Sequence, residues 1–173
     1  MGRWRSLNCW LTRRSAVGPD EVPFAHTGGV AALFWVIIAC VFSELAVLEL
    51  LLPWELVRVT STVLHTAVLL LLLSAYATRR MNPHLVVPSG LVVANGGSTR
   101  LLLPWKNVAV VKPGAASKEP GRLWYEVNGM TNVLIALDPP MLWGAQSVSS
   151  VAIFADDPKG LVASAQHWKA RGV

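Results

Sequence analysis

Five ionisable side chains interrupt the most apolar part of the chain, residues 42–73. An ionised group at the centre of a bilayer costs several kcal/mol, so residues of this kind usually pair with one another or take part in function. Acid–base chemistry needs a carboxylate within reach of a base such as histidine. Glu44 and His65 are therefore the candidate catalytic pair. The five residues are Glu44, Glu49, Glu55, Arg58 and His65.

Two apolar runs on either side of a short turn predict a helical hairpin in a membrane. Residues 29–52 and 59–77 each have a length suited to crossing roughly 30 Å of hydrocarbon. The segment PWEL between them is too short for anything except a tight turn. The run Leu69–Leu73 is apolar on every side of a helix, which argues against a helical pair in a soluble core. We assign the hairpin to residues 29–81.

Folding this hairpin about its turn places residues at equal sequence distance at equal depth. Glu44 then matches His65, roughly 16 Å from the turn at a rise of about 1.5 Å per residue, and Glu49 matches Thr60. One interpretation is a hydrogen bond that fixes the helix register, or a protonated Glu44 bonded to the backbone. The other is a proton relay, a ligand site or a contact with another membrane subunit.

Basic residues predict the orientation of the hairpin. Cytoplasmic flanks of membrane helices carry an excess of Lys and Arg. Arginines precede the first helix and follow the second, whereas Arg58 alone follows the turn. Both termini are therefore expected to be cytoplasmic. The flanking arginines are Arg3, Arg5, Arg13, Arg14, Arg79 and Arg80.

The segment before the first apolar run, residues 1–28, is expected to be a basic amphipathic arm and a linker. Residues 4–14 have the pattern of a short helix lying in the membrane interface, with Trp and Leu on one side and Arg elsewhere. A disordered basic tail that only enforces topology is an equal alternative. The Gly and Pro residues that follow predict a linker rather than a continuous helix.

Composition agrees with a membrane anchor joined to one small domain. Of the 173 residues, 53% are hydrophobic and 14% are charged, whereas about a quarter are charged in a typical soluble domain. The net charge of +5 favours an anionic membrane surface. No dense stripe of Lys and Arg occurs, so nucleic acid is not an expected partner. The two cysteines predict neither a structural disulfide nor a metal site.

After Arg80 the periodicity changes from helical to strand-like. Short β-branched and aliphatic runs separated by Gly, Pro, Asn and Ser predict an antiparallel barrel or sandwich in a cytoplasmic domain of residues 82–173. A helix should follow, with Asp156 or Asp157 as its cap and Pro158 in its first turn. Seven strands are expected, at 84–87, 90–95, 99–104, 107–112, 122–127, 132–138 and 148–155.

Three short motifs lie in this predicted domain: a GLVV strand at 90–93, a PWKNV segment at 104–108 and a DDP helix start at 156–158. Two membrane helices followed by these motifs resemble bacterial membrane proteins that carry a pleckstrin-homology-like (PH-like) domain. The resemblance covers about residues 30–170. It implies a PH-like seven-stranded barrel with a C-terminal helix, held at the cytoplasmic face of the inner membrane. It implies no catalytic residue.

The resemblance favours a non-enzymatic scaffold or accessory protein whose PH-like domain binds a protein partner or lipid headgroups. Four basic residues around the polar loop 113–121 form either a headgroup patch or a solvated rim: Lys106, Lys112, Lys118 and Arg122. The segment 139–146 reads as a turn, in which Met141 and Trp143 would insert into the bilayer, contact a partner or fold back over the barrel. Trp105 and Trp124 are expected in the core.

Motifs for common enzyme chemistry do not occur in the sequence. We find no Gly-rich phosphate loop, no GxSxG elbow, no HExxH and no Cys/His ligand cluster, so neither a cofactor nor a metal is expected. His26 and His84 can approach each other where the hairpin meets the β domain, yet nothing supplies a nucleophile between them. The alternative function is a small membrane enzyme, or a transport or resistance accessory subunit, that uses Glu44 and His65.

Overall fold

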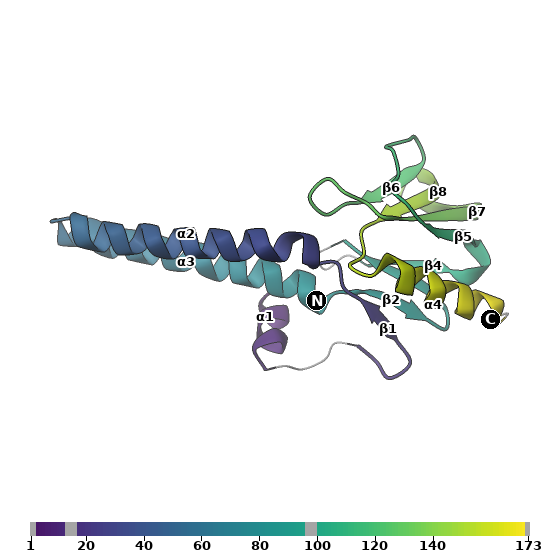
Figure 1. The fold of residues 1–173 in the computed structure, drawn as a ribbon, viewed down its shortest axis with the longest axis horizontal. Coiled ribbons are helices and arrows are strands. Elements are labelled where there is room, and N and C mark those ends of the chain that lie inside the picture. Colours follow the sequence, from purple (N-terminus) through teal and green to yellow (C-terminus); the bar gives the residue numbers. More distant parts are fainter. Residues whose placement is uncertain (1–2, 13–16, 96–99, 172–173) are drawn as a thin grey trace.

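A long helical hairpin projects from a β domain in the computed structural model, which describes residues 3–12, 17–95 and 100–171 (Figure 1). Helix α2 (Gly28–Leu51) and helix α3 (Glu55–Met81) have 24 and 27 residues. Their lengths are about 36 Å and about 40 Å at 1.5 Å per residue. Both helices are therefore long and apolar enough to span a membrane.

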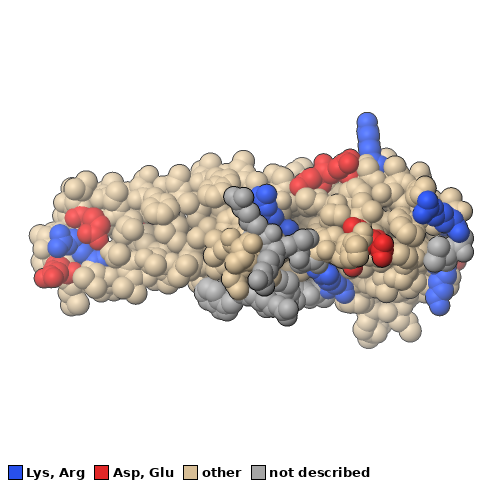
Figure 2. Space-filling view, turned by 90° about the horizontal axis from the view of Figure 1, so that it is seen from below, with Lys and Arg blue, Asp and Glu red and all other residues tan. Residues whose placement is uncertain are grey.

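The sequence explains where the two helices end. Pro53 lies in the turn, where it cannot continue the hydrogen bonding of α2. Glu55 in the first turn of α3 and Arg79 and Arg80 in its last turn complement the helix dipole. Most apolar side chains of both helices face outward. On the face in Figure 2, charged side chains gather at the tip of the hairpin, and others lie at its base and over the β domain, with a stretch of uncharged surface after the tip.

Helix α1 (Arg3–Leu11) packs against α3 near the β domain (Figure 1). The edge of the Trp10 ring meets Tyr76, with 6.1 Å between ring centroids, and Tyr76 stacks on Phe34 at 4.3 Å. Of the two alternatives for residues 4–14, the helix is confirmed as far as Leu11. Arg13 and Arg14 lie outside the described residues.

The β domain consists of two four-stranded sheets and one helix. The first sheet is antiparallel, in the order β1-β2-β3-β4, and the second has the order β5-β7-β8-β6, with β6 parallel to β8. The strands of the first sheet are β1 (Val22–Phe24), β2 (His84–Val87), β3 (Gly90–Ala94) and β4 (Arg100–Pro104). Those of the second are β5 (Val108–Pro113), β6 (Arg122–Tyr125), β7 (Val133–Trp143) and β8 (Gln146–Ile153). Helix α4 (Pro158–Ala170) follows.

All seven predicted strands occur, but the prediction of a closed barrel is wrong. The 3-10 turn Trp105–Asn107 separates β4 from β5, and these two strands do not pair with each other. Strand β6 joins the second sheet by parallel pairing with β8 instead of extending an antiparallel series. Two sheets with two edges each therefore replace one continuous barrel. Helix α4 contacts both β5 and β2 and so bridges the two sheets.

Two further strand boundaries differ from the prediction. Strand β1 lies in the predicted linker and pairs with β2, with Phe24 opposite His84. Strand β1 has three residues, one of which is Pro23. Proline in a short run argues against a strand, although it is tolerated in an edge strand such as β1. The predicted turn at 139–146 is mostly strand, because β7 continues to Trp143 and β8 begins at Gln146. The true turn is Gly144-Ala145.

The core fills the space between the two sheets and α4. Trp105 is 5% exposed, and its indole N–H donates to the Val87 carbonyl at 3.1 Å, as its predicted core position requires. Trp124 is only half-buried, so its predicted core position is wrong. It lies on β6, an edge strand of the second sheet. The largest fully buried side chains include Leu85, Leu91, Leu103, Ile135, Ile153 and Leu161.

Candidate functional site

The structure brings the predicted pair in the hairpin together. Glu44 Oε2 lies 3.6 Å from His65 Nε2, across the interface between α2 and α3. His65 Nδ1 donates to the Ser61 carbonyl at 2.8 Å, which leaves Nε2 to face the carboxylate. The His65 side chain is 13% exposed, whereas that of Glu44 is 64% exposed. The two side chains therefore face each other between α2 and α3, at a separation longer than a hydrogen bond.

The second carboxylate of α2 has a different partner from the one predicted. Thr62 Oγ1 donates to Glu49 Oε1 at 2.6 Å, while the predicted Thr60 donates to the Leu56 carbonyl of its own helix. The predicted partner is wrong by two residues. Equal sequence distance from the turn predicts equal depth, but it does not predict which side chains point into the interface between the two helices. No group of three or more His, Cys, Asp or Glu side chains that could hold a metal occurs among the described residues.

The four predicted basic residues differ in their partners. Lys118 lies 3.8 Å from Glu126 and 5.7 Å from the centre of the Trp124 ring. Arg122 forms an ion pair with Glu119 at 2.9 Å, and its Nε donates to Ser150 Oγ at 2.9 Å. The remaining two are exposed: Lys106 lies in the 3-10 turn before β5, and Lys112 lies near the end of that strand.

The β7–β8 hairpin carries Met141 and Trp143 to the far end of the β domain. Met141 packs against the core, Trp143 is 38% exposed, and Leu142 between them is 78% exposed. Strand β8 starts beside the hairpin turn and leads toward Asp156 at the base of α2. Its eight residues span about 25 Å. The strand therefore separates the β7–β8 turn from the base of α2, on the side of the β domain that points away from the hairpin (Figure 1).

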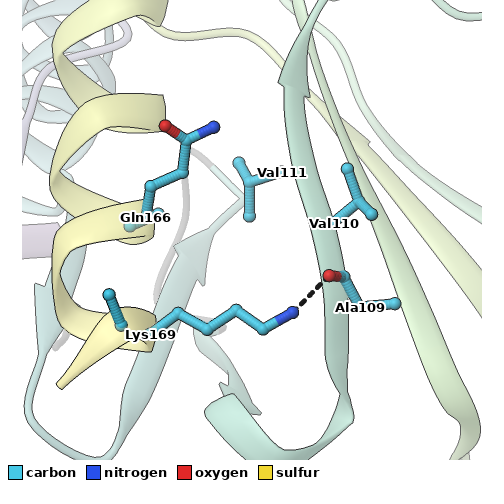
Figure 3. Close-up of a pocket in the computed structure, with 7 residues that line it drawn as sticks. Ala109, Val110, Val111, Gln166 and Lys169 are labelled. Carbon is cyan, nitrogen blue, oxygen red and sulfur yellow. Dashed lines mark hydrogen bonds between the residues drawn. The ribbon is translucent and has the colours of Figure 1, made fainter. Parts of the chain in front are cut away.

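A groove of about 470 Å³ separates the exposed edge of β5 from the second half of α4 (Figure 3). Strand β5 is an edge strand, so one side of its backbone has no strand partner. Val110 lines the groove and is 51% exposed. From the other wall, Lys169 Nζ donates across the groove to the Ala109 carbonyl. Gln166 also lines this wall. The groove combines free backbone groups, apolar side chains and one cation.

The β domain is attached to the base of the helical hairpin by Asp156. Its carboxylate accepts from the backbone N–H of Thr27 at 3.1 Å and of Gly28 at 2.9 Å, at the positive end of the α2 dipole. The Asp156 N–H donates to the Ala25 carbonyl at 2.8 Å. Of the two predicted caps of α4, Asp157 is the one that acts, accepting from Gly160 N–H at 2.9 Å. The role of Asp156 has no local sequence signal.

Two buried histidines meet at the same junction, as the sequence predicted. The His26 and His84 rings have centroids 4.7 Å apart and are 3% and 1% exposed. His84 is fully bonded: Nδ1 accepts from Ala94 N–H at 3.1 Å, and Nε2 donates to the Phe154 carbonyl at 3.0 Å. Neither ring nitrogen of His26 has a hydrogen-bond partner within the described part of the chain.

Burial dominates the ionisation of both histidines. It lowers the pKa of His26 to about 4, with the nearby charge of Arg79 as a second cause. It lowers the pKa of His84 to about 3, with His26 as a second cause. Both rings are therefore neutral at pH 7. A neutral His84 is also what its two hydrogen bonds need, because one nitrogen must accept while the other donates.

Comparisons with protein-family models, with curated proteins and with solved structures found no match to this chain.

Proposed function

We propose that this chain is a membrane-anchored, non-enzymatic adaptor. In this proposal α2 and α3 cross the bacterial inner membrane as a multi-pass hairpin, and both termini lie in the cytoplasm. The β domain is a PH-like variant in which two four-stranded sheets and α4 replace a closed barrel. It binds a protein partner rather than catalysing a reaction.

The fixed attachment of the β domain carries this proposal. Asp156 bonds the first residues of α2, and Asn128 Nδ2 donates to the Gly29 carbonyl at 2.5 Å. Strand β1, which precedes the hairpin, pairs with β2, which follows it. A domain tied to its anchor at several points is held at one height and one orientation. Such an arrangement suits a protein that presents a surface to a partner near the membrane.

The groove beside β5 is the surface that we assign to the partner. An extended peptide can pair with an exposed strand edge through its backbone while adjacent pockets select its side chains. Here the edge of β5 supplies the backbone groups, and Val111 and α4 supply the walls. The groove lies along the last turns of α4, which point away from the hairpin (Figure 1). A cytoplasmic segment can therefore enter it without meeting the bilayer.

Site-directed photo-cross-linking in native membranes tests this assignment. A photoreactive residue at Val110 should give one discrete protein adduct, because Val110 lies on the edge strand that lines the groove and is 51% exposed. The substitution Gln166→Trp should abolish the adduct by filling the groove. His167→Trp, one residue along on an exposed part of α4 outside the groove lining, is the matched control and should retain it. An adduct that survives Gln166→Trp would refute the assignment of the groove.

The Glu44 and His65 pair favours one alternative, a membrane enzyme or a transport or resistance accessory subunit. Their separation of 3.6 Å permits proton transfer after a small movement. Glu44→Gln and His65→Leu, each made alone, distinguish the two functions. An adaptor should keep its Val110 adduct and its function in the host cell in both variants. Loss of host function with normal membrane insertion and an intact adduct would favour the alternative.

A further inference from the structure

A cavity of about 460 Å³ lies where the membrane hairpin meets the β domain. Its walls come from the segment before α2, the first turn of α2, the last turns of α3 with Pro83, and Asp156 from the segment between β8 and α4. This is the level at which the apolar length of both helices ends. A cavity at that level opens toward the headgroup layer of a bilayer that surrounds the hairpin. We ask which molecule fits it.

The lining divides into an apolar wall and a charged rim. Ala31 and Tyr76 come from the membrane helices, and Pro23 comes from β1. Tyr76 is 5% exposed and is fixed by its stacking on Phe34. Aromatic rings are common at this depth, where one side is apolar and the other is wet. This wall suits the glycerol and upper acyl part of a lipid.

The charged rim carries one cation and one anion, Arg80 and Asp156. Arg80 is exposed, and it makes no ion pair with any of the described residues. A guanidinium with free donors is well suited to a phosphate. The Asp156 carboxylate already accepts from two backbone N–H groups, yet it is exposed, and a carboxylate has about four acceptor positions. It can therefore accept from an ammonium group as well.

We propose that this cavity binds a bilayer phospholipid whose headgroup carries both a phosphate and a primary ammonium, as in phosphatidylethanolamine. Arg80 holds the phosphate and Asp156 accepts from the ammonium, while the glycerol backbone lies against Tyr76 and Ala31. The opposite charges of the rim match the zwitterionic headgroup better than a purely anionic one. This inference rests on membrane insertion of the hairpin, but not on the partner groove.

Native mass spectrometry of the full chain in detergent tests the proposal. The chain is titrated in turn with phosphatidylethanolamine, phosphatidylglycerol and phosphatidylcholine of identical acyl chains. We expect the phosphatidylethanolamine adduct to dominate. Arg80→Gln should weaken it by about tenfold or more, because the variant loses a hydrogen bond between two charged groups. Equal binding of phosphatidylglycerol or phosphatidylcholine would overturn the headgroup assignment.

Arg79→Gln is the matched control, because it removes the same charge one residue away. Arg79 lines the small cavity of His26 and His84 rather than this one. Arg79→Gln should change the phosphatidylethanolamine adduct by less than about twofold, because Arg79 does not line the lipid cavity. Nonspecific attraction to lipid would depend on both arginines equally, so it would make the two variants behave alike. Equal loss in the two variants, or no adduct in the wild-type chain, would overturn the proposal. Membrane fractionation of each variant separates a lost lipid site from failed insertion.

Discussion

The junction histidines show how two residues of one type differ in their environment. His84 satisfies two backbone groups, whereas His26 is buried beside it with neither ring nitrogen bonded within the described structure. The charged groups near them are Arg79, Glu126 and Asp156. Replacing a buried polar group that has no partner costs little, while removing one that has partners leaves those partners unsatisfied. His26 is therefore the residue to change in a test of the buried pair.

We predict that stability falls as the pH is lowered through this pair. The folded pKa values are about 4 and about 3, below the ordinary 6.5, so the unfolded chain binds more protons between pH 6.5 and those values. The unfolding free energy then decreases as the pH falls through this window, by about 2 kcal/mol per histidine between pH 7.5 and pH 5. Guanidinium unfolding in detergent, followed by tryptophan fluorescence, measures this loss.

His26→Leu provides the comparison for this pH dependence. The variant should be about as stable as the wild type at pH 7.5, since no hydrogen bond to His26 is lost within the described structure. It should lose only about half as much stability by pH 5, because one of the two titrating rings is gone. An unchanged pH dependence in His26→Leu would show that other groups cause the acid destabilisation.

Individual contacts could be predicted from the sequence where two residues lie at the same level of the hairpin or at the junction between the hairpin and the β domain. It placed Glu44 opposite His65 and brought His26 near His84, because both pairs follow from the fold of the hairpin. It missed the role of Asp156, which depends on a contact with a residue 128 positions away in the chain. A local motif such as the DDP helix start predicts a cap but contains no information about such a distant partner.

At the scale of the elements, the β2–β3 hairpin depends on the glycine at its end. Gly90 has φ +156°, and a Cβ there would overlap the Leu103 carbonyl on β4. Gly114 has a similar φ of +148°, but a Cβ there would have no atom within 4 Å. The two glycines thus share a backbone conformation that side chains rarely adopt, and only one adds a steric clash.

We predict that Gly90→Ala destabilises the β domain more than Gly114→Ala does. Both variants incur a backbone penalty of about 1 kcal/mol or more. The clash in Gly90→Ala must also separate β3 from β4, which should raise the total loss to about 3 kcal/mol or more. Thermal unfolding of the two variants in the same detergent gives the comparison. Equal losses would mean that β4 moves aside freely at this position.

The strands themselves were predictable because their patterns are local. The runs LVVAN and RLLLP alternate or accumulate apolar residues between turn-forming residues, and they form β3 and β4. The predicted strand 132–138 is shorter than β7, because the two prolines at 139 and 140 indicate a turn, although the strand continues to Trp143. Strand pairing was not predictable, since the parallel contact of β6 with β8 joins segments that no local pattern connects.

For the whole molecule, the attachment between hairpin and β domain is the feature that sets its shape. Asp156 holds the first turn of α2, and its neighbour Asp157 caps α4. The two adjacent carboxylates therefore have separate structural roles. A substitution of Asp156 therefore tests the attachment between the hairpin and the β domain, whereas the same substitution of Asp157 tests only the first turn of α4.

We predict that Asp156→Ala loosens the β domain from its anchor. Hydrogen exchange at the Thr27 and Gly28 amides should rise by at least tenfold, because each loses a hydrogen bond to a charged acceptor. Asp157→Ala should raise exchange in the first turn of α4 and leave Thr27 and Gly28 unchanged. Mass spectrometry of peptides from both regions measures the two effects. Unchanged exchange at Thr27 and Gly28 in Asp156→Ala would contradict the proposed attachment.

Strand β1 also constrains the order in which the molecule can be made. It leaves the ribosome before α2 and α3, but its partner β2 is synthesised only after both helices. The first sheet is thus completed only after both helices of the hairpin have been synthesised. In the proposed topology, a chain that crossed the membrane an odd number of times would leave β1 and β2 on opposite sides, so this sheet could not form unless the hairpin had inserted correctly.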